Sequence, residues 1–362
     1  MTRIFVICLS PRQPTILQHS SSVESKKSEP RNKITYAGTD QKNKPIMNHN
    51  HNHNHEVPLS PSPPLLSRDE LRARVLPQMV FSDGSEGSNT GPPAPAPHYI
   101  SSAGRARLRF EVEGNAIVTG GLGALGLEAS RALLEHGLSG LVIFDRDSEQ
   151  AQVTVQDLKR SFATRTIIFK EVDVTDEIAV GNAVAEAGRE LGSIDILLCF
   201  AGVVSCMHAL EMPAAEFRRT LDINTTGSFL CAQAVARLMV EQDTGGSIIF
   251  TASISGHRAN FPQPQVAYNV SKSGVLMMKN CLAAEWARYG IRVNSVSPGY
   301  MDTVLNEGAG LAQARAAWAS RTPFGRMGQP SELTGAIVLL ASSAGSYISG
   351  ADINIDGGYL TI

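Results

Sequence analysis

The amino-acid sequence predicts an α/β domain built on one parallel sheet with helices on both faces, preceded by a disordered extension. Short runs rich in Val, Ile and Leu alternate with longer helical segments between residues 107 and 362. A glycine-rich turn joins the first of these runs to the first helix, whereas proline, serine and asparagine are concentrated in the first hundred residues. Apolar strands separated by helices are typical of a parallel sheet that is buried on both sides.

Residues 1–106 are predicted to form a largely disordered, low-complexity extension, and residues 107–362 a single domain. Thirteen of the nineteen prolines and six of the nine histidines lie within residues 1–100, where little apolar surface is available to offset the entropy of ordering. Ser67 and Glu70 form a capping-box pattern, so we expect a short helix over residues 67–80. The alternating Asn and His residues at 48–55 are read as linker rather than as a metal site.

Charge and cysteine content argue against several kinds of partner. The net charge of −2 offers no electrostatic basis for binding nucleic acid or an anionic membrane. The five cysteines are scattered, which predicts a reducing compartment and no metal site. The apolar run at residues 4–9 is too short to span a bilayer. We expect a cytoplasmic protein, with a mitochondrial location as the alternative, because the first 23 residues contain two arginines and no acid.

A nucleotide-binding turn is the first motif of the domain. The apolar strand Asn115–Thr119 runs into a glycine turn and then into a helix over Leu127–His136. Gly121, Gly123 and Gly126 fit the pattern G-x-G-x-x-G. At such a turn the first amides of the helix and its dipole face a pyrophosphate. The strand, turn and helix therefore predict a Rossmann-type dinucleotide site.

The second strand carries information about which dinucleotide binds. It covers Leu141–Asp145 and ends in a carboxylate 19 residues after Gly126, where an acid can accept hydrogen bonds from the ribose hydroxyls. We therefore expect NAD, with NADP as the alternative because Arg146 could bind a 2′-phosphate. Further strands are expected at 166–172 and 194–200, with helices at 148–161 and 176–191 between them.

The second half of the domain places polar residues beyond the ends of strands. A helix from Leu221 to about Val240 contains Asn224, and a fifth strand at 247–252 is followed by Ser253. A loop then leads to a helix from Tyr268 to about residue 289. The last two strands are expected at 292–296 and 353–355. Ligands of open α/β sheets bind beyond the carboxyl ends of the strands, so Ser253 is placed for function.

Tyr268 and Lys272 lie four residues apart, which puts them on one face of a helix. Free tyrosine has a pKa of about 10. A fixed positive charge nearby favours the phenolate and lowers that pKa, so the pair could exchange a proton with a substrate oxygen near neutral pH. These residues could also have purely structural roles. Tyr-x-x-x-Lys pairs occur on solvated helix faces, and serines such as Ser253 often cap turns.

Taken together, these motifs resemble the short-chain dehydrogenase/reductase family over residues 108–361. They are Thr119-Gly120 with Gly126, Asp173, Ala201-Gly202, Asn224, Ser253, Tyr268-x-x-x-Lys272 and Pro298-Gly-x-x-x-Thr303. The resemblance implies a doubly wound sheet in the order 3-2-1-4-5-6-7. It also implies that Tyr268 is the general acid/base, that Lys272 lowers its pKa and holds the nicotinamide ribose, that Ser253 binds the substrate oxygen and that Asn224 holds a water in a proton relay.

The resemblance also implies a set of cofactor contacts. These are Gly120, Leu122, Gly123, Leu125, Gly126, Asp145, Arg146, Asp173, Val174, Ala201, Gly202, Tyr268, Lys272, Pro298, Gly299, Met301 and Thr303. Two positions depart from the family pattern. Ala124 replaces a common glycine, and Cys199-Phe200 replaces an Asn-Asn pair, so two side-chain amides that serve the adenosine contacts and a strand tie are absent.

Within the family, the segment after Ser253 is similar to fungal polyol and ketose enzymes such as mannitol 2-dehydrogenase, sorbose reductase and arabinitol 2-dehydrogenase. The reaction implied is the interconversion of a secondary alcohol and a ketone. A 3-oxoacyl thioester or secondary-metabolite ketone reductase is the alternative, and a catalytically silent nucleotide-sensing or scaffold protein is the alternative of another class. Ile254, His257 and Trp318 are candidate substrate contacts, and residues 303–327 are read either as a lid or as surface helices.

The family also implies a homodimer or homotetramer formed through the helices near Asn224 and Tyr268. The apolar residues on those helices fit an interface, but they equally fit plain core burial: Phe229, Val235, Leu238, Leu276 and Trp286.

Overall fold

The computed structural model describes residues 67–85, 87–95, 97–303 and 306–362. The predictions for residues 1–66, including the Asn/His tract, lie outside these ranges. The chain divides into two compact units, Met1–Arg74 and Val75–Ile362. The second unit therefore begins before the expected domain start at residue 107. Within it, the Asn89 amide donates to Asp243 Oδ1 at 2.9 Å, and Ser343 Oγ donates to the carbonyl oxygen of Arg109 at 3.1 Å.

The helix expected over residues 67–80 is shorter than predicted. Helix α1 covers Arg68–Ala73, and Arg74 is extended. Its capping box is present, with Glu70 N donating to Ser67 Oγ at 3.2 Å and Ser67 N to Glu70 Oε2 at 2.7 Å. The cap defines where the helix begins, but none of the six helical residues is buried. A helix this short gains little from propensity alone and needs tertiary packing to continue.

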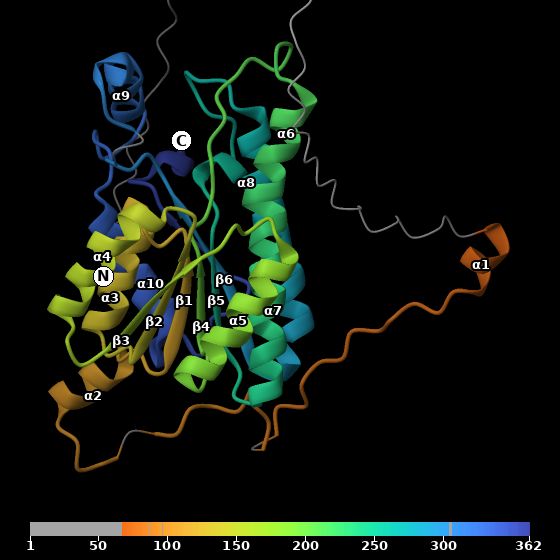
Figure 1. The fold of residues 1–362 in the computed structure, drawn as a ribbon, viewed down its shortest axis with the longest axis vertical. Helices are drawn as coiled ribbons and strands as arrows, with labels where there is room; N and C mark the ends of the chain where they lie inside the picture. The colour runs from red at the N-terminus through yellow and green to blue at the C-terminus, as the bar shows by residue number, and fades with distance from the viewer. Residues whose placement is uncertain (1–66, 86, 96, 304–305) are drawn as a thin grey trace, which may run out of the picture. The chain divides into compact units, whose positions relative to one another are not determined.

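The second unit contains the parallel sheet that the sequence predicts (Figure 1). Seven strands pair in the order β3-β2-β1-β4-β5-β6-β7, and every pairing is parallel. This order confirms the Rossmann-type, doubly wound fold. The strands are β1 Asn115–Thr119, β2 Gly140–Asp145, β3 Thr166–Glu171, β4 Ile196–Cys199, β5 Gly246–Thr251, β6 Ile291–Pro298 and β7 Asp352–Ile355.

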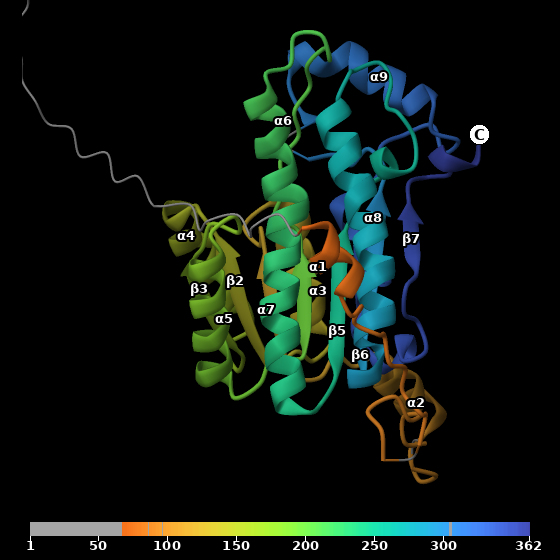
Figure 2. The same cartoon turned by 90° about the vertical axis from the view of Figure 1, so that its right-hand side faces the viewer.

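Helices cover both faces of the sheet, and alternate strand residues face opposite layers. In β1, Ile117 packs into the core beneath α5, α7 and α8, whereas Ala116 and Val118 pack beneath α3, α4 and α10. Figure 2 shows α5, α7 and α8 side by side over one face. The helices of this unit are α2 Ser102–Arg109, α3 Ala124–Glu135, α4 Ser148–Ser161, α5 Glu177–Leu191, α6 Ala214–Leu221, α7 Gly227–Gln242, α8 Val266–Trp286, α9 Ala312–Ser320 and α10 Thr334–Ala341.

The helix that carries Asn224 begins earlier than predicted and is not a regular α-helix throughout. Helix α6 starts at Ala214, after Pro213, and continues through a π-helical turn at Asp222–Thr226 into α7. A π turn accommodates one extra residue and occurs frequently at functional sites. Asn224 is completely buried in this turn.

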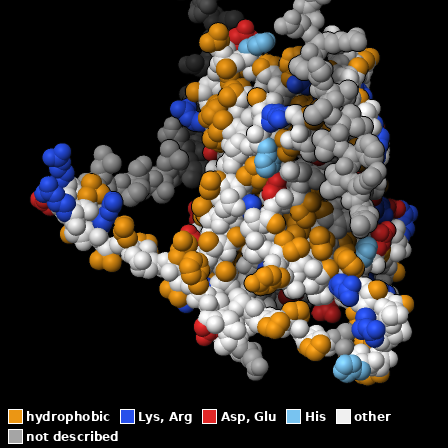
Figure 3. Space-filling view, turned by 180° about the vertical axis from the view of Figure 1, so that it is seen from behind, with side chains coloured by type: hydrophobic (Ala, Val, Ile, Leu, Met, Phe, Trp, Pro, Cys, Tyr) orange, Lys and Arg blue, Asp and Glu red, His pale blue; other side chains and the backbone are white. Residues whose placement is uncertain are grey.

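The surface of the described residues gives no indication of a membrane span, since none of their helices is both long and apolar enough to cross a bilayer. On the face drawn in Figure 3, hydrophobic side chains lie in several groups between polar and charged ones. Apolar atoms form a large share of the surface of any folded protein, so these groups alone do not identify a binding face.

The central strand β4 provides a test of the packing. Leu197 is fully buried between neighbouring strands and helices, so Leu197→Ala should lower the free energy of unfolding by about 2–5 kcal/mol. Val153, which is 70% exposed on α4, serves as the control, and Val153→Ala should change it by no more than about 0.5 kcal/mol. Urea midpoints at equal slope measure both effects. Equal losses in the two variants would contradict the assignment of the core.

Candidate active site

The predicted site residues meet at the carboxyl edge of the sheet. In a parallel sheet all strands end at the same edge, so residues far apart in sequence are brought together there. Apart from Tyr268 and Lys272 on α8, the predicted cofactor contacts lie in or next to five connections at this edge. These are the β1–α3 turn with Gly120, Leu122, Gly123, Leu125 and Gly126; the end of β2 with Asp145 and Arg146; the segment after β3 with Asp173 and Val174; that after β4 with Ala201 and Gly202; and the end of β6 with Pro298, Gly299, Met301 and Thr303.

The β1–α3 turn requires glycine at two positions for steric reasons. Gly120 has a φ of +64°, and a Cβ there would lie 2.6 Å from Ala201 N. A Cβ at Gly126 would lie 2.4 Å from the carbonyl oxygen of Gly120. At Gly123 the nearest atom to a Cβ is 3.3 Å away, and no side chain caps the helix at this N-cap position. Helix α3 therefore begins without a side-chain cap, and N-terminal amides of this kind bind the pyrophosphate of dinucleotides.

The end of β2 is linked to this turn by a carboxylate. Asp145 Oδ2 accepts a hydrogen bond from Leu122 N at 3.1 Å. The neighbouring Arg146 pairs with Asp173, with 3.3 Å between Nη1 and Oδ2. Burial would raise the pKa of Asp173, but hydrogen bonds from Thr175 and Arg146 outweigh it and lower the pKa from 3.8. Arg146 is therefore partly neutralised by a carboxylate that remains ionised.

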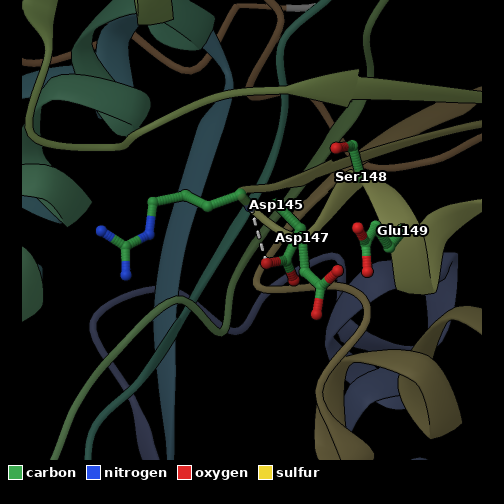
Figure 4. A pocket seen from close by; sticks show the side chains of 5 residues that line it. Asp145, Asp147, Ser148 and Glu149 are labelled. Carbon is green, nitrogen blue, oxygen red and sulfur yellow. Dashed lines mark hydrogen bonds between the residues drawn. The ribbon is translucent and has the colours of Figure 1, made fainter.

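A cavity of about 570 Å³ opens beside these residues (Figure 4). Its walls carry three carboxylates and one guanidinium, contributed by Asp145, Arg146, Asp147, Ser148 and Glu149. The excess of negative charge makes the cavity suited to neutral hydroxyl groups that donate hydrogen bonds.

The strand tie left in doubt by Cys199 and Phe200 is made by Thr119 instead. Thr119 Oγ1 accepts a hydrogen bond from Ala201 N at 3.3 Å, and Phe200 N donates to the carbonyl oxygen of Thr119 at 2.9 Å. Cys199 is buried in the core, and burial holds the pKa of its thiol well above 9.0. The missing amides are thus compensated on the strand side of the loop.

The proposed acid/base pair lies on the first turns of α8. Lys272 Nζ is 5.6 Å from the centre of the Tyr268 ring and donates to the carbonyl oxygen of Thr251 at 2.7 Å. Ser253 lies just beyond β5, and its side chain acts to lower the pKa of Tyr268. The structure therefore brings Ser253, Tyr268 and Lys272 together as the sequence predicts.

The protonation behaviour of this pair differs from the expectation. Burial lowers the pKa of Lys272 to about 8. Burial also raises the pKa of Tyr268 above 10.0, and the hydrogen bond with Ser253 acts against that increase. The sequence predicted a Tyr268 pKa lowered by the lysine. In this structure the desolvation of the phenol has the largest effect on the pKa of Tyr268, and Ser253 acts in the opposite direction.

Asn224 joins the site from the opposite side. Its Oδ1 accepts from Val203 N at 2.8 Å, and its Nδ2 donates to the Val203 carbonyl and to Ser271 Oγ, both at 2.9 Å. A Cβ at Gly202 would lie 3.2 Å from Asn224 Oδ1 and 3.7 Å from Lys272 Nζ. Asn224 and Lys272 thus both lie against the loop that follows β4.

The three candidate substrate contacts occupy different places. Ile254 is buried in the turn after Ser253. His257 points toward β7, where its Nε2 lies 2.9 Å from Asp352 Oδ2 and 3.2 Å from Ser297 Oγ. Trp318 is buried on α9 and stacks on Tyr300, with ring centres 4.5 Å apart.

Several polar residues around Trp318 were not predicted from the sequence. They are Ser255, Asn260, Gln263, Gln265 and Tyr300, which are joined by side-chain hydrogen bonds. The only signal in the sequence is the density of amide and hydroxyl side chains between Ser253 and Tyr268. No group of three or more His, Cys, Asp or Glu residues in the described ranges is arranged to hold a metal ion.

Comparisons with known proteins agree with this geometry. A family model described as enoyl-(acyl carrier protein) reductase matches residues 122–360. The chain is 35% identical to an NADP-dependent mannitol dehydrogenase of Hypocrea jecorina over 268 residues, which cover 73% of this chain and 99% of the relative. It is 36% identical to a D-arabinitol 2-dehydrogenase (ribulose-forming) of Candida tropicalis over 265 residues, covering 69% and 94%.

Solved structures show the same likeness. A short-chain type dehydrogenase/reductase from Mycobacterium marinum is 41% identical with a TM-score of 0.64, and the match covers 69% of this chain and 97% of that one. A gluconate 5-dehydrogenase from Burkholderia cenocepacia, in complex with NADP and tartrate, is 32% identical with a TM-score of 0.65, covering 71% and 99%. These relatives support a pyridine nucleotide as the cofactor.

Gly126→Ala should weaken nucleotide binding, because the new methyl group collides with the Gly120 carbonyl and displaces the turn. Strain of about 1–3 kcal/mol corresponds to a loss of about tenfold in affinity for each 1.4 kcal/mol. Titration of reduced nucleotide fluorescence measures it. The control is Gly181→Ala on α5, where no atom lies within 4 Å of the added Cβ. That variant should keep its affinity and gain about 0.5–1 kcal/mol of stability. Unchanged binding in Gly126→Ala would argue against the turn as the pyrophosphate cradle.

Proposed function

The chain belongs to the short-chain dehydrogenase/reductase family, and we propose that it interconverts a polyol and its ketose by hydride transfer with a pyridine nucleotide. Relatives named as mannitol, arabinitol and galactitol dehydrogenases, all of which act on secondary alcohols, support this substrate class. The observation that carries the proposal is the convergence of Ser253, Tyr268 and Lys272 at the edge of the sheet that also carries the glycine turn. An oxidoreductase acting on CH–OH groups needs that combination of groups.

In the direction of oxidation, Tyr268 takes the proton of the substrate hydroxyl while the carbinol carbon gives up a hydride and becomes a carbonyl. Ser253 Oγ holds the substrate oxygen throughout. A bound pyridine nucleotide would supply the hydride acceptor. In reduction the same groups act in reverse, so Tyr268 returns its proton to the new alkoxide.

Lys272 is suited to pass that proton onward. Because burial lowers its pKa to about 8, it can both hold and release a proton near neutral pH. We assign to it the renewal of the Tyr268 protonation state. Asn224 has its side-chain amide engaged by Val203 and Ser271, so its proposed contribution is to hold the π turn against the loop after β4.

We propose NAD as the preferred nucleotide. The cavity at the end of β2 carries Asp145, Asp147 and Glu149 against the single cation Arg146, and Arg146 is paired with Asp173. A 2′-phosphate would meet a net negative charge, whereas ribose hydroxyls would find acceptors. The mannitol dehydrogenase relative is NADP-dependent by name, so the ratio of the two cofactors is the decisive measurement.

Assembly into a homodimer or homotetramer through the helices near Asn224 and Tyr268 is also proposed. The five apolar residues named from the sequence pack against the core rather than outward. The exposed apolar side chains on α8 are Val266, Val270 and Met277. Val266 also lines a groove of about 680 Å³ with residues of α6. Light scattering measures the assembly.

The four cysteines of the described ranges are free, which agrees with the proposed cytoplasmic location.

Tyr268→Phe should reduce kcat/KM for polyol oxidation by about 10²–10⁴-fold, the usual contribution of a positioned acid/base. Nucleotide affinity should remain, since only one hydroxyl is removed. A panel of polyols, ketoses and acyl thioesters followed by nucleotide absorbance would identify the substrate. Turnover retained by Tyr268→Phe would refute the proposed mechanism, and turnover confined to acyl thioesters would refute the substrate class.

Two single variants should move cofactor preference in opposite directions. Asp145→Ser removes a negative charge and should raise the NADP/NAD ratio of kcat/KM about tenfold, equivalent to about 1.4 kcal/mol. Arg146→Ala removes the only cation of the cavity and should lower the same ratio. If the wild-type enzyme prefers NADP, the assignment of NAD is wrong.

A further inference from the structure

An unbroken chain of hydrogen bonds runs from helix α9 to Ser253. Trp318 Nε1 donates to Gln263 Oε1 at 3.0 Å, and Gln263 Nε2 donates to Gln265 Oε1 at 3.1 Å. Gln265 Nε2 in turn donates to Ser255 Oγ at 3.2 Å. Ser255 contacts Ser253 Oγ twice, through its own Oγ and its backbone N–H, both at 3.1 Å. Five residues from the β5–α8 loop and α9 thus form one network.

The direction of this chain is determined at the tryptophan. An indole N–H can only donate a hydrogen bond, so Gln263 must present its oxygen to Trp318 and its amino group to Gln265. Gln265 must then accept with its own oxygen and present its amino group to Ser255. The orientation of two amides, which could otherwise flip, follows from the position of one ring.

Burial makes this arrangement costly to break. Gln265, Ser255 and Trp318 are 7%, 4% and 5% exposed. A buried polar group that loses its partner retains the full cost of desolvation. Gln265 also occupies the N-cap position of α8 without capping the helix. The Gln265 side chain therefore donates to Ser255 instead of capping α8, although residues that cap helices are usually preferred at this position.

Tyr300 holds the tryptophan end of the chain in place. Its ring stacks on Trp318 with an interplanar angle of 7°. Its hydroxyl oxygen accepts from Asn260 Nδ2 at 2.8 Å and from Gln263 Nε2 at 3.2 Å. The latter contact is a branch, since it does not lie on the route from Trp318 to Ser253.

We propose that this chain couples the docking of α9 to the orientation of the Ser253 hydroxyl, with Gln263 and Gln265 as positioning residues. When Trp318 is seated, the amides align and Ser255 fixes the position of Ser253 Oγ, which accepts from the Ser255 backbone N–H and donates to Ser255 Oγ. When Trp318 leaves, Gln263 loses the donor that sets its orientation, and Ser255 loses a defined partner. The proposal rests on the role assigned to Ser253 and Tyr268 in the proposed function.

Two variants interrupt the chain without removing a residue that touches substrate in this scheme. Gln265→Met keeps an unbranched side chain of similar length, and Trp318→Phe keeps a ring that can stack on Tyr300. We expect kcat to fall about tenfold to a hundredfold in Gln265→Met and by a smaller factor in Trp318→Phe, with unchanged nucleotide affinity. Ser320→Ala is the control, since it removes one exposed hydroxyl from α9 that bonds only to the Ala317 carbonyl oxygen and not to the chain. Equal losses in Ser320→Ala and Trp318→Phe would overturn the proposal.

A pH profile separates positioning from simple loss of packing. The hydrogen bond from Ser253 counteracts the rise in the Tyr268 pKa, so a misplaced Ser253 lets that pKa rise further. The rising limb of kcat/KM for oxidation should therefore move to higher pH in Gln265→Met. In a Ser253→Ala background the Gln265→Met substitution should add no further loss, since its target is gone. An unshifted profile or additive losses would contradict the chain.

A spectroscopic titration keeps this test independent of the substrate assignment. The difference in phenolate absorbance between each protein and its Tyr268→Phe counterpart isolates the titration of Tyr268. If the wild type oxidises no polyol, the proposed function fails, but Gln265→Met should still shift the Tyr268 titration upward. If the wild type is active and neither kcat nor this titration changes in Gln265→Met, the chain is wrong and the proposed function stands.

Discussion

A single buried ammonium group sets the geometry on which the site depends. Lys272 is 5% exposed, and its bond to the Thr251 carbonyl ties α8 to the end of β5. Removing an ammonium from water is unfavourable, which is why the pKa of Lys272 falls to about 8. That cost is tolerated where the reaction gains from it, because the lysine is then held beside Tyr268 and is close to neutrality. Burying the Lys272 ammonium lowers the free energy of unfolding, but it provides a group that can gain or lose a proton near pH 8.

The opposite side of the site is held by an irregular helix rather than by an ion. The π turn at Asp222–Thr226 turns Asn224 toward Val203 and Ser271, and Ser271 Oγ donates to the carbonyl oxygen of Tyr268 at 2.7 Å. A regular helix would place this side chain differently, because the π turn shifts the register of everything after it. The loop after β4, α7 and α8 are thereby linked through one buried amide. The π turn therefore supports the tyrosine from the side opposite Lys272.

The parts predictable from the sequence are those that depend on short-range pattern. The parallel sheet, the glycine turn, Asp145 and the Tyr268–Lys272 pair each follow from periodicity or from motifs within a few residues, whereas the strand order was implied by the family resemblance. The π turn was not predicted, because one inserted residue leaves the apolar pattern nearly unchanged. The direction of the Tyr268 pKa shift was predicted wrongly, because it depends on burial by elements that are far away in the sequence. The contact of Trp318 with Gln263 spans 55 positions in the chain and has no local signature at all.

These contacts explain why the loop between β5 and α8 is long. Fifteen positions separate Ser253 from Tyr268, and a shorter loop could bring the same two residues together for catalysis. The additional residues carry Gln263 and Gln265, the two amides that reach from Ser255 to Trp318. A substrate with several hydroxyl groups needs both a shaped enclosure and an exactly oriented serine. Because both requirements fall on one loop, the proposed chain would transmit a change in the enclosure to the serine.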